Sequence, residues 1–351
     1  MSIIVAILVF GLIIFIHELG HFMVAKACNV KINEFAIGMG PRLFKIQKGE
    51  TIYSIRAFPI GGFVAMEGED ETSSHERSLN NKPISQRIAI SAAGAIMNFI
   101  LGFIAVVIMV NLKTGDSEPL IFTSRISGFS ENSLSQQSGL QVNDEILKIN
   151  GKGILSDIDL TYLLQTDSDG VYSFQVLRNG EKLDIENVQL ESRTFSDGTK
   201  GYTIDFHIFG EKKSFINAAA YSFKKTISFG RMVWMSLGDI VTGNFKLNQL
   251  SGPVGIVSAI DTVIETEQGE SFANTIYSLL VLLTMITVNL GVFNLLPIPA
   301  LDGGRIVFLI IEAIRGKPIK PEHEGLVHFV SFIVLILLLL LVTFNDIKKF
   351  F

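Results

Sequence analysis

The chain has 351 residues, of which 48% are hydrophobic and only 18% are charged. Its mean hydropathy of +0.43 is typical of an integral membrane protein rather than of a soluble domain. The net charge of −5 provides no basic surface for nucleic acid, and the single cysteine, Cys28, excludes a disulfide framework within the chain and a cysteine-based zinc site.

The first predicted membrane span, residues 3–28, contains the motif His17-Glu18-Leu19-Gly20-His21. No side chain from Ile3 to Ile16 is polar, so these groups lie inside an apolar helix, where unpaired polar groups cost kilocalories each. Two histidines four residues apart share one helix face and can bind one zinc ion, with the glutamate beside the open coordination position. The alternative is a chance match on an interfacial helix. Without a basic start or a small-residue cleavage site, the segment does not resemble a cleaved signal peptide.

A hairpin region over residues 43–66 and a second span are predicted next. Residues 43–47 and 51–56 read as two strands joined by a turn at Lys48-Gly49. The second predicted span covers residues 88–112 and contains small residues that permit close helix packing, namely Ser91, Ala92, Ala93, Gly94, Ala95 and Gly102.

Residues 117–208 predict a small domain of short strands separated by turns. The expected strands cover residues 121–126, 145–149, 172–178, 183–190 and 202–207, with one helix over 156–164. Residues 214–241 predict a further helix, which is too charged to span a membrane and suits a membrane interface. Its apolar stripe comprises Ile216, Ala220, Phe223, Ile227, Trp234, Leu237 and Val241.

The third predicted span, residues 275–293, leads into the run Asn294-Leu295-Leu296-Pro297-Ile298-Pro299-Ala300-Leu301-Asp302-Gly303-Gly304. Pro297 and Pro299 cannot continue a helix, and a membrane tolerates non-helical chain only inside protein or beside a polar cavity. A catalytic zinc site takes three protein ligands, and Asp302 lies at a depth similar to that of the two histidines. We therefore expect Asp302 to be the third ligand; the alternative is an N-cap for the helix beginning near Arg305.

A fourth span, residues 326–344, is almost entirely Leu, Ile and Val and reads as a lipid-facing anchor. Eight basic residues lie between the first two spans and four between the last two, so both connections are expected to be cytoplasmic and both termini outside. His17 is then about 21 Å from the outer edge, in the cytoplasmic third of the bilayer.

Taken together, these motifs resemble the bacterial site-2 protease family of intramembrane zinc metalloproteases. The resemblance rests on the zinc motif in the first span, on the run from Asn294 to Gly304, and on residues 138–151, which resemble the signature of bacterial PDZ domains. Further stretches that fit are 38–41, 59–64, 80–83 and Ser251-Gly252-Pro253-Val254-Gly255. Only one PDZ domain is visible, whereas some members carry two.

The resemblance implies a polytopic α-helical membrane protein with four transmembrane helices, a membrane-associated β-hairpin and an inserted extracytoplasmic α+β PDZ domain. The catalytic membrane parts would be residues 1–114 and 271–351, the PDZ domain 117–208, and an interfacial helix with a linker 212–270. The protein would lie in the bacterial inner membrane, with its active site near the cytoplasmic side.

By the same resemblance, His17, His21 and Asp302 hold one zinc ion and Glu18 is the general base. Asn294 contacts substrate, and we place Pro297, Pro299, Gly61 and Gly62 in the same substrate-binding region. The expected substrates are single-span membrane proteins, such as anti-sigma factors, and signal-peptide remnants, cleaved first by another protease. One hairpin edge would pair with the unwound substrate as an added strand; the alternative is a cap that only packs.

Two rival functions remain at this point. One is a non-catalytic membrane scaffold that binds a peptide through its PDZ domain, although a relic would be expected to have lost Glu18 or a ligand. The other is a transporter with a structural zinc site, which would need an internal repeat of broken helices. The PDZ domain could bind a peptide ligand or act only as a spacer.

Overall fold

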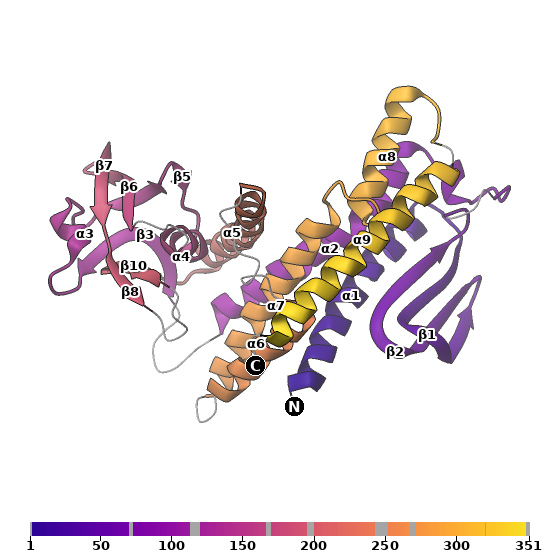
Figure 1. Ribbon diagram of the computed structural model, residues 1–351, viewed down its shortest axis with the longest axis horizontal. Helices are drawn as coiled ribbons and strands as arrows, with labels where there is room; N and C mark the ends of the chain where they lie inside the picture. Colours follow the sequence, from indigo (N-terminus) through magenta and orange to yellow (C-terminus); the bar gives the residue numbers. More distant parts are fainter. Residues whose placement is uncertain are drawn as a thin grey trace. The chain divides into compact units, whose positions relative to one another are not determined.

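The computed structural model describes residues 2–69, 73–112, 120–165, 170–194, 200–242, 252–266, 271–319 and 321–348 (Figure 1). The chain forms two compact units, one made of residues 1–105 and 237–351 and the other of residues 106–236. Ser117, at the predicted start of the small domain, and Ser251 lie outside the described residues.

Four helices among the described residues are long and apolar enough to cross a membrane. They are α1 (Ser2–Ala27), α2 (Ile84–Asn111), α7 (Phe272–Asn294) and α9 (Pro321–Lys348). Each matches one predicted span to within a few residues at either end, which confirms a polytopic helical protein. Most apolar side chains of α9 are exposed, as expected of a helix that contacts lipid.

Glycines bring α1 and α7 close to α2. A Cβ atom at Gly20 of α1 would lie 2.5 Å from the carbonyl oxygen of Ala93. A Cβ at Gly102 of α2 would lie 2.7 Å from Val288 on α7. Such contacts leave no room for a side chain, so the small residues predicted to allow close packing do so here.

Strands β1 (Ile32–Lys48) and β2 (Thr51–Met66) are longer than the predicted hairpin and pair in two places. Residues 42–48 pair with 51–56 around the tight turn, and residues 34–37 pair with both 52–55 and 62–65. Gly38 and Gly40, both with φ of +85°, let β1 bend between its two halves. The predicted strands 43–47 and 51–56 are therefore only the outer part of this sheet.

A buried ion cluster holds the bent strands together. Glu34 is only 6% exposed and accepts hydrogen bonds from Ser54 Oγ at 2.6 Å and Arg56 Nη2 at 2.8 Å, and it also pairs with Arg42. Burial raises the pKa of Glu34, but the bonds from Arg42, Ser54 and Arg56 outweigh this effect and lower the pKa to about 2. Glu34 of β1 therefore stays charged and links its own strand to β2.

Two shorter helices complete the membrane unit, α6 (Pro253–Thr266) and α8 (Asp302–Arg315). Helix α6 falls in a segment predicted only as linker, because it is too short for a span. Asp346 of α9 binds its start by accepting hydrogen bonds from Gly252 N and Gly255 N, both at 2.8 Å. Helix α8 begins three residues before the predicted position near Arg305.

The second unit contains a sheet of order β10-β3-β4-β6-β7, with β5 beside β4 and a separate β8–β9 ladder. Helices α3 and α4 pack with it around an apolar core that includes Leu140, Ile149, Tyr172 and Phe174. The bounds are β3 Leu120–Phe129, α3 Leu134–Gln137, β4 Glu145–Ile149, β5 Lys152–Gly153, α4 Asp157–Gln165, β6 Val171–Arg178, β7 Glu181–Gln189, β8 Glu191–Thr194, β9 Lys200–Thr203 and β10 Phe206–Lys212.

The single strand predicted over residues 202–207 is wrong. It is the end of β9 and the start of β10, which belong to different ladders. Asp205 separates them: its carbonyl accepts from Ser130 N at 2.8 Å and its carboxylate accepts from Ser135 N at 3.0 Å. The bonds at Asp205 therefore go to the loop after β3 and to helix α3 instead of continuing β9.

Helix α5 (Phe215–Thr242) buries polar side chains together with apolar ones such as Tyr221 and Phe229, and it leaves other apolar side chains exposed. Lys225 is buried and pairs with Asp157 at 2.8 Å, and Ser228 donates to the buried Asp159 at 2.5 Å. The exposed apolar side chains include Phe215, Ile216, Phe223, Ile227 and Trp234. Most of the predicted apolar stripe is thus exposed.

Candidate metal centre

The zinc motif lies in the second half of α1, where one helical turn separates His17 from His21. The two rings meet edge to face with centroids 4.8 Å apart. The imidazole side chains of His17 and His21 are only 11% and 10% exposed, so both are largely removed from solvent.

Asp302 reaches the histidines because helix α7 ends at Asn294 and a loop leads to the start of α8. Ala300 adopts a φ of +74°, rare for a residue with a side chain, and its N–H donates to His328 Nδ1 at 2.7 Å. A Cβ at Gly303 would overlap the carbonyl oxygen of Leu296, and one at Gly304 would lie 2.5 Å from that of Ile298. Leu301 occupies the N-cap position and Asp302 the first helical position, so the N-cap alternative for Asp302 is wrong.

The three side chains form a compact triangle of potential ligand atoms. His17 Nε2 lies 3.2 Å from both His21 Nε2 and Asp302 Oδ2, and His21 Nε2 lies 3.4 Å from Asp302 Oδ2. Ligands about 2.0–2.2 Å from a tetrahedral zinc ion are separated by roughly 3.3–3.6 Å. Asp302 Oδ2 is buried and makes no hydrogen bond to a described residue. These residues therefore fit one zinc ion, with a fourth position left for another group.

Helix α2 contacts both imidazole rings. His21 Nδ1 lies 2.7 Å from the carbonyl oxygen of Ile90, and His17 Nδ1 lies 3.2 Å from Asn98 Nδ2. Gly94 lies directly against the rings, since a Cβ there would be 2.5 Å from His17 Cε1. Asn98 was not among the predicted site residues, although a lone amide within an apolar span is a signal that could have found it.

Glu18 lies next to strand β2. A Cβ at Gly62 would be 3.1 Å from Glu18 Cγ and 3.0 Å from the carbonyl oxygen of Ala36. Gly61 adopts a φ of +86° and lies against Met39. The structure therefore brings the backbone at residue 62 beside the glutamate.

Asn294 ends α7, and its Nδ2 lies 3.5 Å from both ring nitrogens of His17. The two prolines lie farther along the loop. Pro297 is exposed, whereas Pro299 is partly buried and lies against Gly304, where a Cβ would be 2.7 Å from Pro299 Cα. Asn294 is thus at the metal centre, and the prolines shape the chain that leads to Asp302.

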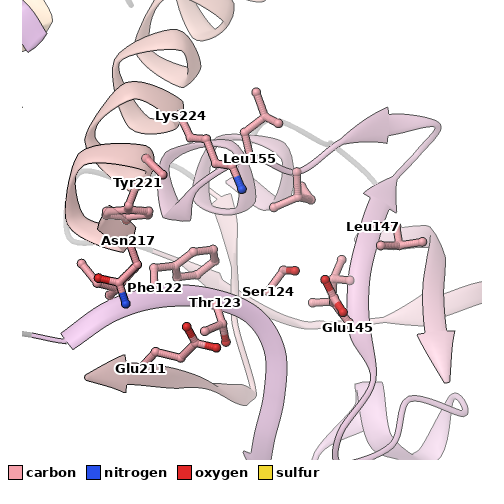
Figure 2. A pocket seen from close by; sticks show the side chains of 14 residues that line it. Phe122, Thr123, Ser124, Glu145, Leu147, Leu155, Glu211, Asn217, Tyr221 and Lys224 are labelled. Carbon is pink, nitrogen blue, oxygen red and sulfur yellow. The ribbon is translucent and has the colours of Figure 1, made fainter. Parts of the chain in front are cut away.

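A cavity of about 340 Å³ occurs in the second unit, between strands β3 and β4 and helix α5. Figure 2 shows its polar lining, including Thr123, Ser124, Glu145, Asn217 and Lys224. It contains one basic and two acidic side chains and no histidine. This lining does not supply the ligand set that the membrane unit assembles.

The family model described as Peptidase family M50 matches residues 5–338. The chain belongs to peptidase family M50. It is 32% identical to the regulator of sigma-W protease RasP of Bacillus subtilis, over 100% of this chain and 99% of the relative. It is also 32% identical to the zinc metalloprotease RasP of Bacillus licheniformis, with the same coverage, and 30% identical to that of Geobacillus kaustophilus, over 100% and 98%.

These matches place the M50 chain among membrane-spanning zinc metalloproteases of the site-2 type. The predicted family, the protease activity and the zinc cofactor are therefore confirmed. The alignment with the Bacillus subtilis protein covers 434 positions, so that relative has residues without a counterpart in this chain of 351.

Proposed function

We propose that the chain is an intramembrane zinc endopeptidase in which His17, His21 and Asp302 hold the metal and Glu18 is the general base. The observation that carries the proposal is the triangle of ligand atoms, 3.2–3.4 Å on each side, formed by two elements almost 300 residues apart in the chain. A scaffold without activity would not need a carboxylate beside an open coordination position. Glu18 and all three ligands are present.

The chain's own residues would divide the chemistry among them. Zinc, when bound, polarises a carbonyl group and lowers the pKa of water to roughly 7. Glu18 accepts a proton from the attacking water and passes it to the leaving amine. The amide of Asn294, at the edge of the cluster, donates to the substrate carbonyl or to the oxyanion that develops from it.

A substrate helix must unwind before its peptide bonds can be attacked. We infer that the segment of β2 around Gly61 and Gly62 pairs with the unwound chain as an added strand and replaces the lost helical hydrogen bonds. Its closeness to Glu18 supports this role. The outer part of the sheet exposes Leu43, Phe44 and Ile46, by 58%, 71% and 73%, which supports contact with lipid.

The substrates follow from the setting of the site. Ligands on a membrane helix select polypeptides within the bilayer, so we propose single-span proteins and signal-peptide remnants, already cut once outside. The name of the Bacillus subtilis relative, regulator of sigma-W protease, favours an anti-sigma factor as one substrate.

The second unit is proposed as a PDZ domain on the outer side of the membrane, together with both termini. We infer that it excludes substrates that still carry a large external domain, and that it can also take up a peptide at its sheet edge. The exposed apolar stripe of α5, including Ile216 and Trp234, supports a position of that helix at the outer membrane interface.

A cleavage assay with a tagged single-span substrate tests the active site. Glu18→Gln should retain zinc and lose cleavage, Asp302→Asn should lose both, and Asn294→Ala should cleave slowly with its zinc content unchanged. Full activity of Glu18→Gln would refute the proposed base.

Two variants test the remaining parts. Proline substitutions along one edge of the hairpin should reduce cleavage without loss of zinc, because each removes a backbone donor that the added strand would need. Deletion of residues 117–208 should permit cleavage of uncut substrate. Unchanged cleavage in the first case, or complete resistance of uncut substrate in the second, would refute the corresponding role.

A further inference from the structure

Asn98 is a buried polar side chain in the interior of α2 that faces the metal centre. The residue is 0% exposed, and its Nδ2 lies 3.2 Å from His17 Nδ1. Its Oδ1 has no hydrogen-bond partner among the described residues. A buried amide costs free energy unless it is hydrogen-bonded, and a polar group in a membrane span is functional by default.

Metal binding determines which ring nitrogen of His17 carries a proton. Nε2 is the atom that faces His21 and Asp302. A neutral imidazole that offers Nε2 to a metal keeps its proton on Nδ1, so Nδ1 becomes a donor and needs an acceptor. Only the oxygen of an asparagine amide accepts, and rotation of the amide by half a turn exchanges its oxygen and nitrogen.

Asn294 is less well placed to be this acceptor. Its Nδ2 is 3.5 Å from both Nδ1 and Nε2 of His17, so it faces the ring carbon between them. The two ring nitrogens point in diverging directions, and one atom cannot lie along both. Asn98 is 3.2 Å from Nδ1.

We propose that Asn98 is a positioning residue for the zinc site, whose amide oxygen accepts the Nδ1–H of His17 and directs Nε2 toward the metal. This inference rests on the proposed zinc ligands. The carbonyl oxygen of Ile90 has the same relation to His21, at 2.7 Å from Nδ1. Helix α2 therefore orients both imidazoles although it supplies no ligand itself. Loss of a hydrogen bond that orients a metal-binding histidine typically weakens metal binding by about 10–100-fold.

The test is a zinc titration of the detergent-solubilised full chain against a competing chelator of known affinity. Asn98→Leu keeps the approximate volume and removes the acceptor, whereas Asn98→Asp restores an oxygen acceptor. Thr287→Val is the matched control, because Thr287 is buried against the same stretch of α2, bonds the Asn98 carbonyl at 3.2 Å and makes no bond to His17. Asp302→Asn reports on the proposed zinc site itself.

We expect Asn98→Leu to weaken zinc binding about 10–100-fold, and Asn98→Asp and Thr287→Val to bind within about threefold of the wild type. The inference is overturned if Asn98→Leu binds like the wild type, or if Asn98→Asp is as weak as Asn98→Leu. If Asp302→Asn also binds like the wild type, the proposed zinc site has failed rather than Asn98 alone.

A measurement on the wild type keeps the inference testable if the leucine variant does not fold. Nitrogen NMR of the zinc-loaded chain with labelled histidine should show that His17 carries its proton on Nδ1. A proton on Nε2 would overturn the proposed ligand atom of His17 and this inference together.

Discussion

Gly94 offers a sharp test of how tightly the metal centre is packed. It lies on α2 against both imidazoles, and a Cβ there would be 2.5 Å from His17 Cε1 and would also overlap His21 Nε2. Carbon atoms in contact are ordinarily about 3.5–4.0 Å apart. In Gly94→Ala, the ring of His17 must therefore move by roughly 1 Å, against ligand separations of only 3.2–3.4 Å.

A displacement of about 1 Å in a catalytic group can cost about 100-fold in rate, or roughly 2.7 kcal/mol in activation free energy. Overpacking also destabilises a core by about 1–3 kcal/mol. Helix propensity acts in the opposite direction, because alanine favours a helix over glycine by about 1 kcal/mol. We therefore expect a large loss of cleavage and of zinc affinity with a smaller change in thermal stability.

Gly11→Ala is the matched control, because it lies on α1 and a Cβ there would meet no atom within 4 Å. It should keep the wild-type cleavage rate and zinc affinity. The assay combines cleavage of a single-span substrate, chelator competition for zinc and thermal unfolding in detergent. Cleavage by Gly94→Ala within threefold of the wild type, with equal zinc affinity, would refute the packing argument.

The remaining predictions concern buried charges away from the zinc site. The folded pKa of Glu34 is about 2, below its ordinary value of 4.5. The stability that this carboxylate gives the folded protein is therefore complete above about pH 4.5 and disappears as the pH falls toward 2. Glu34→Gln should lose this pH dependence in a pH series of thermal unfolding. Arg178 binds the fully buried Asp144 through two bonds of 2.7 Å, so Arg178→Leu should destabilise the second unit by about 3–5 kcal/mol in chemical unfolding monitored within it, and an unchanged midpoint would contradict this. Asp346→Ala leaves the N–H of Gly252 without its partner and should destabilise the chain by about 1–3 kcal/mol; equal thermal stability of the variant would show that this bond is dispensable.

Two kinds of feature could be predicted from the sequence because they are local. Hydropathy over about twenty residues identifies a membrane helix without reference to its neighbours, and all four spans were found in this way. The spacing of His17 and His21 likewise places them on one face of any helix. The zinc motif and the proline-containing run before Asp302 therefore indicated the chemistry before any fold was known.

Other features depend on contacts between distant segments, which no local pattern encodes. The double pairing of β1 residues 34–37 arises from the bends in two long strands, and the buried polar face of α5 depends on partners such as Asp157 and Asp159. Helix α6 is too short to be recognised as a span, and its start depends on Asp346, more than 90 residues away.

The sequence by itself predicted a membrane protein that carries two candidate zinc ligands, His17 and His21, within an apolar span. Only the tertiary structure placed Asp302 within 3.2–3.4 Å of them and set Asn98 and Gly94 of α2 against the imidazole rings. The physical reason is that hydrophobicity and helical period act over a few turns, whereas ligand geometry depends on how α1, α2 and the α7–α8 loop pack together.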